Sequence, residues 1–467
     1  MLVGHLFFAE LVTGHAIHAT ISALISERTG IHVTIKKSTQ ARFFGLCAVL
    51  FASLTCASVV TVENYGYPIT DRFAATVVGT PVEFQAQLPK SIPFTGKSIT
   101  IFPERVTPDV FFYGSELLYS VALQDNDAPL IFIIAGTGSS HNGTTNKNMA
   151  KAFYQAGFHV VSISSPTYNN FVIAASKTGV VGHAERDAED IYRVFEMIWA
   201  ELKQDIQVTS FNVIGPSLGG FNAAYVSKLD EERKAFNFEH VLLINPPVSL
   251  YNSISLLDRM TQDIPGGVDN FDRFANRLMH AYATTYKEPV GSGGDNFLYQ
   301  VYKELDLKDE QLAALIGTSF RLASSTLAFT ADVMADYGYI KPKGLPLDRY
   351  SNLQIYNDVA VRLGFTDYYF EFFYPFYKAD YPDKTQDEFI AAISLRSIED
   401  YLRNTKKITV MHNADDVILE PGEINFFSEV FGDRATIYPY GGHIGNINYR
   451  ENVAHMVATF SKEGAQQ

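Results

Sequence analysis

The sequence predicts an α/β protein with a mostly parallel central sheet, helices on both faces of the sheet and a large helical insertion. From Pro129 onward, short apolar runs typical of buried strands alternate with helical patterns, and this alternation favours parallel βαβ units. A glycine-rich turn at residues 215–220 (GPSLGG) joins one such run to a helical pattern. Residues 250–404 then interrupt the alternation with a stretch far longer than one connection needs.

The size and composition of the chain are those of one large domain carrying an insertion. The chain has 467 residues, of which 47% are hydrophobic, so it can bury a substantial core. Its formal net charge is −14, and it contains no basic run that could follow a phosphate backbone. We therefore expect no nucleic acid partner.

The N-terminal segment, residues 1–57, is interpreted as an export signal or a membrane anchor. Residues 43–62 carry no charge and follow a basic stretch, which is the order of regions in a secretory signal. Three outcomes are open: cleavage after Ala57, lipidation of Cys56, or retention as an anchor, because the apolar segment is just long enough to span a bilayer. In each case we expect an exported protein, whether periplasmic, secreted or membrane-anchored.

The first part of the core, residues 58–249, is expected to begin with antiparallel strands and continue with βα units. Segments 99–102 and 117–123 are the candidates for the antiparallel strands. The clearest helix spans 184–202, with apolar residues at helical spacing and acidic residues in its first turns, where the helix dipole favours them. The run 240–244 predicts the next buried strand.

Residues 250–404 are expected to form a helical lid, which leaves 405–467 as the second part of the core. Eight of the ten residues from 368 to 377 are aromatic. The first interpretation of this segment is an aromatic core that anchors the lid. The second is an apolar acyl pocket or a surface that meets membrane or lipid. A lid over the site would exclude water and favour small or amphipathic acyl esters over folded polypeptides.

Two late strands place polar residues on loops. A predicted strand at 406–411 leads into Asp415 and Asp416, so these carboxylates come at the C-terminal end of a strand. A short strand at 436–438 is followed by His443, which lies on a glycine-flanked loop. Acid and histidine therefore follow successive strands of the predicted sheet.

The turn at 215–220 has the G-x-S-x-G pattern of a nucleophile elbow. Such a turn holds the serine in a sparsely populated backbone conformation, and the flanking glycines avoid Cβ clashes between strand and helix. Ser217 would then stand at a helix N-terminus, where backbone N–H groups favour a developing negative charge. The pattern alone is a weak signal, but an acid and then His443 follow in the required order.

With these motifs, the sequence resembles the α/β-hydrolase superfamily, in its serine esterase, lipase and peptidase branch. The resemblance covers residues 98–250 and 405–463 and leaves the middle of the chain unmatched. It implies that Ser217 is the nucleophile and that His443 acts as general base and then as general acid. It also implies that an aspartate orients the imidazole.

Two residues are candidates for this acid. We favour Asp416, because the apolar residues 417–419 follow it directly as the return of the loop into the core. Asp415 remains the alternate.

The resemblance further implies an oxyanion hole built from backbone N–H groups. Leu218, directly after the nucleophile, would supply one of them. The predicted strand 130–134 ends in the glycine-rich loop 135–140, so Thr137 or a neighbour would supply the second. One such donor typically contributes about 3 to 4 kcal/mol to transition-state stabilisation.

The sequence contains no pattern for a metal or a cofactor. No two histidines have the i, i+4 spacing of a helical zinc site, and both cysteines, Cys47 and Cys56, lie in the N-terminal segment. The turn at 136–138 lacks the third glycine of a dinucleotide fingerprint, because His141 stands there. We therefore expect neither a cofactor nor a metal.

Together these observations predict an exported serine hydrolase that cleaves a carboxylic ester through an acyl-enzyme. The alternatives within the fold are a serine peptidase and a thioesterase. A peptidase would need acidic groups in the lid to bind a substrate amine, and Asp332, Asp336 and Glu371 are available. The alternative without catalysis is an envelope-associated protein that retains the fold. The expected partner is a small-molecule acyl substrate, and any membrane contact would involve the N-terminal segment or the lid.

Overall fold

The computed structural model of the protein describes residues 60–271, 273–274 and 308–460. The expectations of cleavage, lipidation at Cys56 or anchoring of residues 1–57 fall outside these residues and stay predictions. Part of the predicted lid, residues 275–307, also lies outside them.

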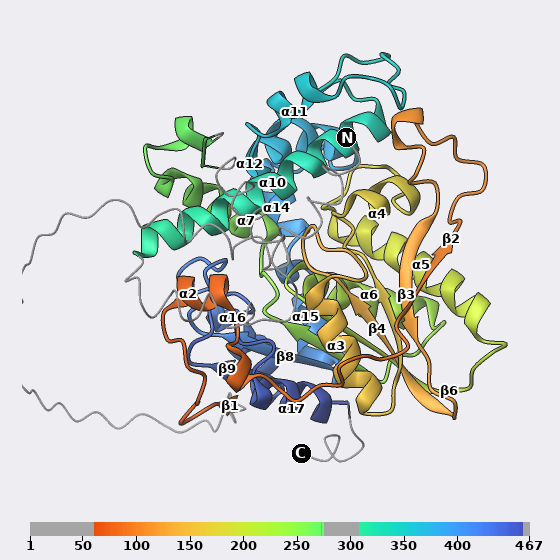
Figure 1. Ribbon diagram of the computed structural model, residues 1–467, viewed down its shortest axis with the longest axis vertical. Coiled ribbons are helices and arrows are strands. Elements are labelled where there is room, and N and C mark those ends of the chain that lie inside the picture. The colour runs from red at the N-terminus through yellow and green to blue at the C-terminus, as the bar shows by residue number, and fades with distance from the viewer. Residues whose placement is uncertain (1–59, 272, 275–307, 461–467) are drawn as a thin grey trace, which may run out of the picture.

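A nine-stranded sheet forms the centre of the molecule (Figure 1), with the strand order β1-β9-β8-β7-β6-β4-β5-β3-β2. Two pairs, β2 with β3 and β3 with β5, are antiparallel, and the other pairs are parallel. The sheet is therefore mostly parallel, as the sequence predicted. Its strands are β1 (Val60–Thr61), β2 (Thr95–Ile99), β3 (Leu117–Ala122), β4 (Ala128–Ile134), β5 (His159–Ile163), β6 (Val208–Pro216), β7 (His240–Ile244), β8 (Ile408–Asn413) and β9 (Ala435–Tyr438).

The first antiparallel strand differs from the prediction. The apolar segment 99–102 was expected to form it, but β2 ends at Ile99 and begins at Thr95. The residues of β2 before Ile99 are exposed, because β2 is the edge strand of the sheet and pairs only with β3 among the described strands. An edge strand needs no apolar run, so the pattern gave no signal for it.

Helices cover both faces of the sheet (Figure 1). The α-helices of the core are α2 (Arg72–Val78), α3 (Thr144–Gln155), α4 (Asn169–Ala174), α5 (Ala184–Leu202), α6 (Leu218–Arg233), α16 (Ile424–Phe431) and α17 (Arg450–Ala458). The predicted helix at 184–202 is confirmed with the same bounds. Short 3-10 helices are η3 (Val82–Phe84), η4 (Asp109–Phe111) and η10 (Gly432–Arg434).

Strand β4 shows why the sheet is buried on both faces. Leu130, Phe132 and Ile134 pack into one hydrophobic cluster, which includes residues of α5, α6 and α16. The alternate residues Ile131 and Ile133 pack into a second cluster with α3 and α17. A continuous apolar run is the sequence that such a central parallel strand requires.

The described residues between β7 and β8 form helices and turns. The α-helices of this part of the chain are α7 (Leu250–Arg259), α10 (Asp309–Ala335), α11 (Gln354–Ala360), α12 (Phe365–Asp367), α13 (Tyr374–Tyr377), α14 (Gln386–Ala392) and α15 (Glu399–Asn404). Its other helices are η5 (Met260–Asp263), η6 (Val268–Asn270), the π-helix η7 (Tyr368–Phe373), η8 (Lys378–Asp380) and η9 (Leu395–Ile398). We call residues 250–404 the insertion. That it closes over Ser217 as a lid stays a prediction.

Helix α10 is the long helix of the insertion and crosses the molecule above α2 (Figure 1). It is long and apolar enough to cross a membrane, but 89% of its most apolar window is buried inside the protein. Packing within the molecule therefore accounts for the apolar composition of α10.

The aromatic segment 368–377 is largely buried. Phe372 stacks on Tyr337, with ring centroids 4.5 Å apart. The hydroxyl of Tyr368 donates to the carbonyl of Val181 at 3.1 Å, and the neighbouring Tyr377 donates to the carbonyl of Val180 at 2.6 Å. The segment thus fastens the insertion to the loop before α5. This packing favours the first interpretation, an aromatic core.

Candidate active site

The turn between β6 and α6 has the backbone of a nucleophile elbow. Ser217 adopts φ 54° and ψ −125°, a conformation that a residue with a side chain rarely occupies. A Cβ on Gly219 would lie 2.1 Å from the carbonyl oxygen of Ile134, and one on Gly220 would lie 2.7 Å from that of Gly215. The glycines therefore allow α6 to start directly against the sheet.

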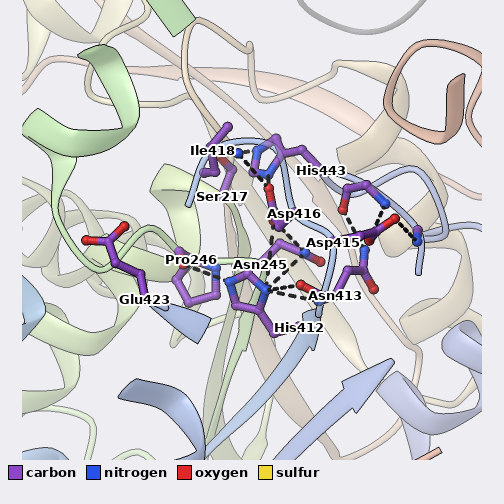
Figure 2. A network of polar contacts seen from close by, with 12 residues as sticks. Ser217, Asn245, Pro246, His412, Asn413, Asp415, Asp416, Ile418, Glu423 and His443 are labelled. Atoms are coloured by element: carbon purple, nitrogen blue, oxygen red, sulfur yellow. Dashed lines mark hydrogen bonds and ion pairs between the residues drawn. The ribbon is translucent and has the colours of Figure 1, made fainter. Parts of the chain in front are cut away.

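Ser217, His443 and Asp416 meet at the carboxyl ends of the parallel strands (Figure 2). They follow β6, β9 and β8, which are parallel and so end at the same edge. The Nε2 of His443 lies 2.9 Å from the Oγ of Ser217. The Nδ1 of the same ring lies 3.0 Å from Oδ2 and 3.1 Å from Oδ1 of Asp416. The structure thus brings the three predicted residues into one line of hydrogen bonds.

The carboxylate of Asp416 is buried but well supplied with donors. The amide Nδ2 of Asn245 donates to its Oδ2 at 2.7 Å, and the N–H of Ile418 donates to its Oδ1 at 3.0 Å. Burial by itself would raise the pKa of Asp416, but the nearby imidazole of His443 and the N–H of Ile418 bring the pKa below its usual value. Asp416 is therefore ionised, and the Nδ1 of His443 carries the proton that it donates to Asp416.

Asp415 contacts the backbone of the histidine loop and not the imidazole. Its Oδ1 accepts a hydrogen bond from the N–H of Gly442 at 2.9 Å, and its Oδ2 accepts one from Gly441 at 3.3 Å. Burial raises the pKa of Asp415 above its usual value. Of the two candidate acids, Asp416 is thus the one in contact with His443.

Two further polar residues lie beside Asp416, and neither was predicted to be part of the site. Asn245 follows β7 with φ 46°, and His412 is fully buried at the end of β8. The N–H of Asn413 donates to Nδ1 of His412 at 2.9 Å, so Nε2 carries the proton and donates to the carbonyl of Pro246 at 3.1 Å. Burial lowers the pKa of His412, which keeps this imidazole neutral. The sequence signal that could have found these two residues was a polar side chain at the end of each buried strand.

The loop after β4 leaves the N–H group of Thr137 free. The N–H of Gly138 donates to Oγ1 of Thr167 at 2.8 Å, and that of Ser139 donates to the carbonyl of Gly136 at 3.0 Å. Among the described residues, none accepts a hydrogen bond from the N–H of Thr137. Thr137 can therefore donate to a ligand.

The second predicted donor, Leu218, occupies the first position of α6. A helix leaves the N–H groups of its first turn without acceptors inside the helix. A Cβ on Gly136 would lie 3.5 Å from the Cβ of Ser217, so the loop that carries Thr137 lies directly against the serine. Both predicted oxyanion donors are thus adjacent to Ser217.

A small cavity lies beside Asn245, the residue that donates to Asp416. It is lined by Asn245, Tyr438, Asn446 and Asn452 together with apolar residues, and its volume is about 10 Å³, close to the space needed for one water molecule.

In the part of the chain that the structure describes, no group of three histidine, cysteine or acidic side chains is arranged to hold a metal ion.

Comparison with known proteins gives structural likenesses only. No family model matches the chain, and no curated protein matches it. Similar solved structures include a thioesterase domain from the curacin biosynthetic pathway, with 9% identity and a TM-score of 0.34 over 78% of this chain and 98% of that one. A bacterial membrane phospholipase A has 13% identity and a TM-score of 0.40 over 80% and 87% of the two chains. Proline iminopeptidase from Mycobacterium smegmatis has 14% identity and a TM-score of 0.37 over 78% and 96%.

Because these scores are low, the fold is identified from the chain's own topology. A mostly parallel sheet carries helices on both faces, and a strand, a strained serine and a helix form its elbow. Asp416 then follows β8, and His443 follows β9. This is the chain order of nucleophile, acid and histidine in α/β-hydrolases. The chain therefore has an α/β-hydrolase fold.

Proposed function

We propose that the protein is a serine hydrolase that cleaves a carboxylic ester through an acyl-enzyme. The observation that carries this proposal is the contact of 2.9 Å between Nε2 of His443 and Oγ of Ser217, a serine held at φ 54° on an elbow. A serine hydroxyl is a weak nucleophile until a base takes its proton, and His443 is placed to do so.

The reaction would proceed in two halves. Ser217 Oγ attacks the ester carbonyl while its proton passes to Nε2 of His443, and the same proton then goes to the leaving alcohol. Water next attacks the acyl-enzyme, gives its proton to His443, and Ser217 recovers a proton as the acid leaves. Asp416 stabilises the imidazolium in both halves, and the N–H groups of Thr137 and Leu218 would bind the oxyanion.

The acidic residues of the insertion favour an ester over a peptide with a free amino terminus. The carboxylate of Asp332 already accepts hydrogen bonds from four backbone N–H groups at 338–341. Asp336 is paired with Lys341. Two of the three candidates for binding a substrate amine are thus engaged, which leaves the exposed Glu371.

The test is to label the purified protein with a serine-reactive fluorophosphonate and to assay acyl esters of increasing chain length. A thioester and an aminopeptidase substrate would be measured in parallel. We expect labelling at Ser217, loss of labelling in Ser217→Ala, and turnover of esters. Preferred cleavage of the thioester or of the peptide would instead support those alternatives. An unlabelled, inactive but folded wild-type protein would support the envelope-associated protein without catalysis.

We also propose that this hydrolase acts outside the cytoplasm. The support is the uncharged segment 43–62 and the basic residues before it. Intact mass and N-terminal sequencing of the protein from its native host would test this. We expect a chain that begins near Ser58, a lipid on Cys56, or an unprocessed chain in the membrane fraction. A full-length chain in the soluble cytosolic fraction would contradict export.

A further inference from the structure

The segment between β1 and β2 packs against the loop that carries His443. We call residues 65–80 the N-terminal arm. The arm contains α2. Asp71 is the N-cap of this helix, and its side chain accepts a hydrogen bond from the N–H of Ala74 at 2.7 Å. Gly79, with φ 70°, is the C-cap. The two capping residues, Asp71 and Gly79, thus determine where α2 begins and ends in the sequence.

Three successive N–H groups of the histidine loop donate to side-chain oxygens. Those of Gly441 and Gly442 donate to Asp415, which follows β8 in the core. The third, the N–H of His443 itself, donates to Oγ1 of Thr76 in α2 at 2.8 Å. The main chain of the proposed general base is therefore held by the N-terminal arm.

The loop lies so close to α2 that glycine is required at two positions. A Cβ on Gly442 would lie 2.2 Å from the carbonyl oxygen of Arg72, and one on Gly445 would lie 2.1 Å from that of Ala75. The residues on either side of His443 also have positive φ, 56° at Gly442 and 53° at Ile444. Such a backbone persists only where its surroundings hold it in place.

The arm holds the far end of the loop as well. The hydroxyl of Thr80 donates to the carbonyl of Gly445 at 2.9 Å. The amide of Asn446 donates to the hydroxyl of Tyr65 at 2.9 Å, and that hydroxyl donates to Asn452 at 2.5 Å. The arm thus contacts the loop at His443 and again two and three residues later.

We propose that the N-terminal arm is part of the active site and that Thr76 is a positioning residue for His443. The proposal rests on the proposed function, in which His443 is the base. The hydroxyl of Thr76 donates its own proton to the carbonyl of Arg72 at 2.7 Å, so its lone pair is free to accept from the N–H of His443. Loss of this acceptor would let the imidazole move relative to Ser217. A misplacement of about 1 Å can lower a rate by about 100-fold.

The experiment compares Thr76→Val, which removes the hydroxyl, with Thr76→Ser, which keeps it. Thr459→Val is the matched control, because Thr459 makes the same kind of bond to a carbonyl four residues earlier, at 3.0 Å, on α17. We expect Thr76→Val to lower kcat roughly 10- to 100-fold with KM unchanged. Thr76→Ser should restore most of the wild-type kcat, and Thr459→Val should not change it.

A crystal structure of the Thr76→Val protein gives a readout that does not depend on turnover. We expect the distance between Nε2 of His443 and Oγ of Ser217 to exceed the wild-type hydrogen bond. An unchanged distance would overturn the proposal, and so would an unchanged kcat or a Thr76→Ser protein as slow as Thr76→Val. A wild-type protein without any hydrolytic activity would refute the proposed function, and the distance would still decide the role of Thr76.

Discussion

Asp415 and Asp416 are neighbours in the sequence, but their carboxylates hold different parts of the same loop. Asp416 lies 3.0 Å from the Nδ1 of His443, whereas Asp415 lies 2.9 Å from the backbone N of Gly442. One carboxylate therefore orients the ring, and the other supports the main chain that carries the ring.

We predict that Asp416→Asn lowers kcat much more than Asp415→Asn. An amide at position 416 presents a donor to Nδ1 of His443 and favours the wrong tautomer, for which losses of about ten-thousandfold are typical. The Asp415→Asn protein keeps one acceptor for the loop and should lose roughly tenfold or less. Steady-state kinetics on the best ester measure both, with melting temperatures to check the fold. A larger loss in Asp415→Asn would assign the orienting role to Asp415.

The elbow predicts a strong effect of one added methyl group. In the Gly219→Ala protein the added Cβ would lie 2.1 Å from the backbone oxygen of Ile134. Relief of this clash requires displacement of β4 or of α6. We expect this change to lower the free energy of unfolding by more than about 3 kcal/mol, or to prevent soluble expression. Gly96→Ala is the control, because a Cβ there meets nothing within 4 Å. Equal stability of the two variants, measured by urea unfolding, would contradict the close packing.

Asp187 predicts how stability depends on pH. Burial raises the pKa of this carboxyl well above its usual value, so the folded protein keeps a proton that the unfolded chain loses above about pH 4. This contribution to stability is complete below the unfolded pKa and is lost as pH rises toward the folded pKa, by at most about 1.4 kcal/mol per pH unit.

The Asp187→Asn protein lacks this proton equilibrium and can still accept the N–H of Gly182, which lies 2.9 Å from Oδ2 in the wild type. Its stability relative to the wild type should therefore increase with pH. Urea unfolding of both proteins between about pH 4 and pH 8 measures the difference. A difference that stays constant over this range would mean that Asp187 titrates normally.

The aromatic segment predicts a loss of stability without a change of substrate preference. Phe372 is fully buried, and its ring partners are Tyr337, Tyr339, Tyr368 and Phe376 of the insertion. Phe372→Ala should lower the free energy of unfolding by about 3 to 5 kcal/mol. Phe370→Ala is the control, since Phe370 is 41% exposed, and should cost much less. A shift in the ranking of ester chain lengths in Phe372→Ala would show that this ring also shapes the acyl pocket.

Sequence patterns predicted the features that depend on local order. The bounds of α5 follow from its helical periodicity, and the elbow follows from its glycines, whose role the close approach of Gly219 to β4 makes clear. Strand β2 was misplaced, because an exposed edge strand carries no apolar pattern.

The residues that hold Asp416 and His443 in place could not be predicted from local sequence patterns. Asn245 donates to Asp416 across 171 positions of the sequence, and Thr76 accepts from His443 across 367. Neither residue belongs to a local motif, and each acquires its partner only when distant strands and helices pack. One sequence indicates that such residues end a strand or lie on a helix, but not which atoms they meet.

The contacts between the arm and the histidine loop also bear on when the molecule acquires its activity. Tyr65 and Asn452 form a hydrogen bond across 387 positions of the chain. Contacts between such distant residues require closure of a very large loop and slow the folding of the chains that depend on them. During synthesis, the arm leaves the ribosome long before the segment that it must hold. A nascent chain that lacks the histidine loop would therefore be inert, and hydrolysis would begin only once the arm has packed on that loop.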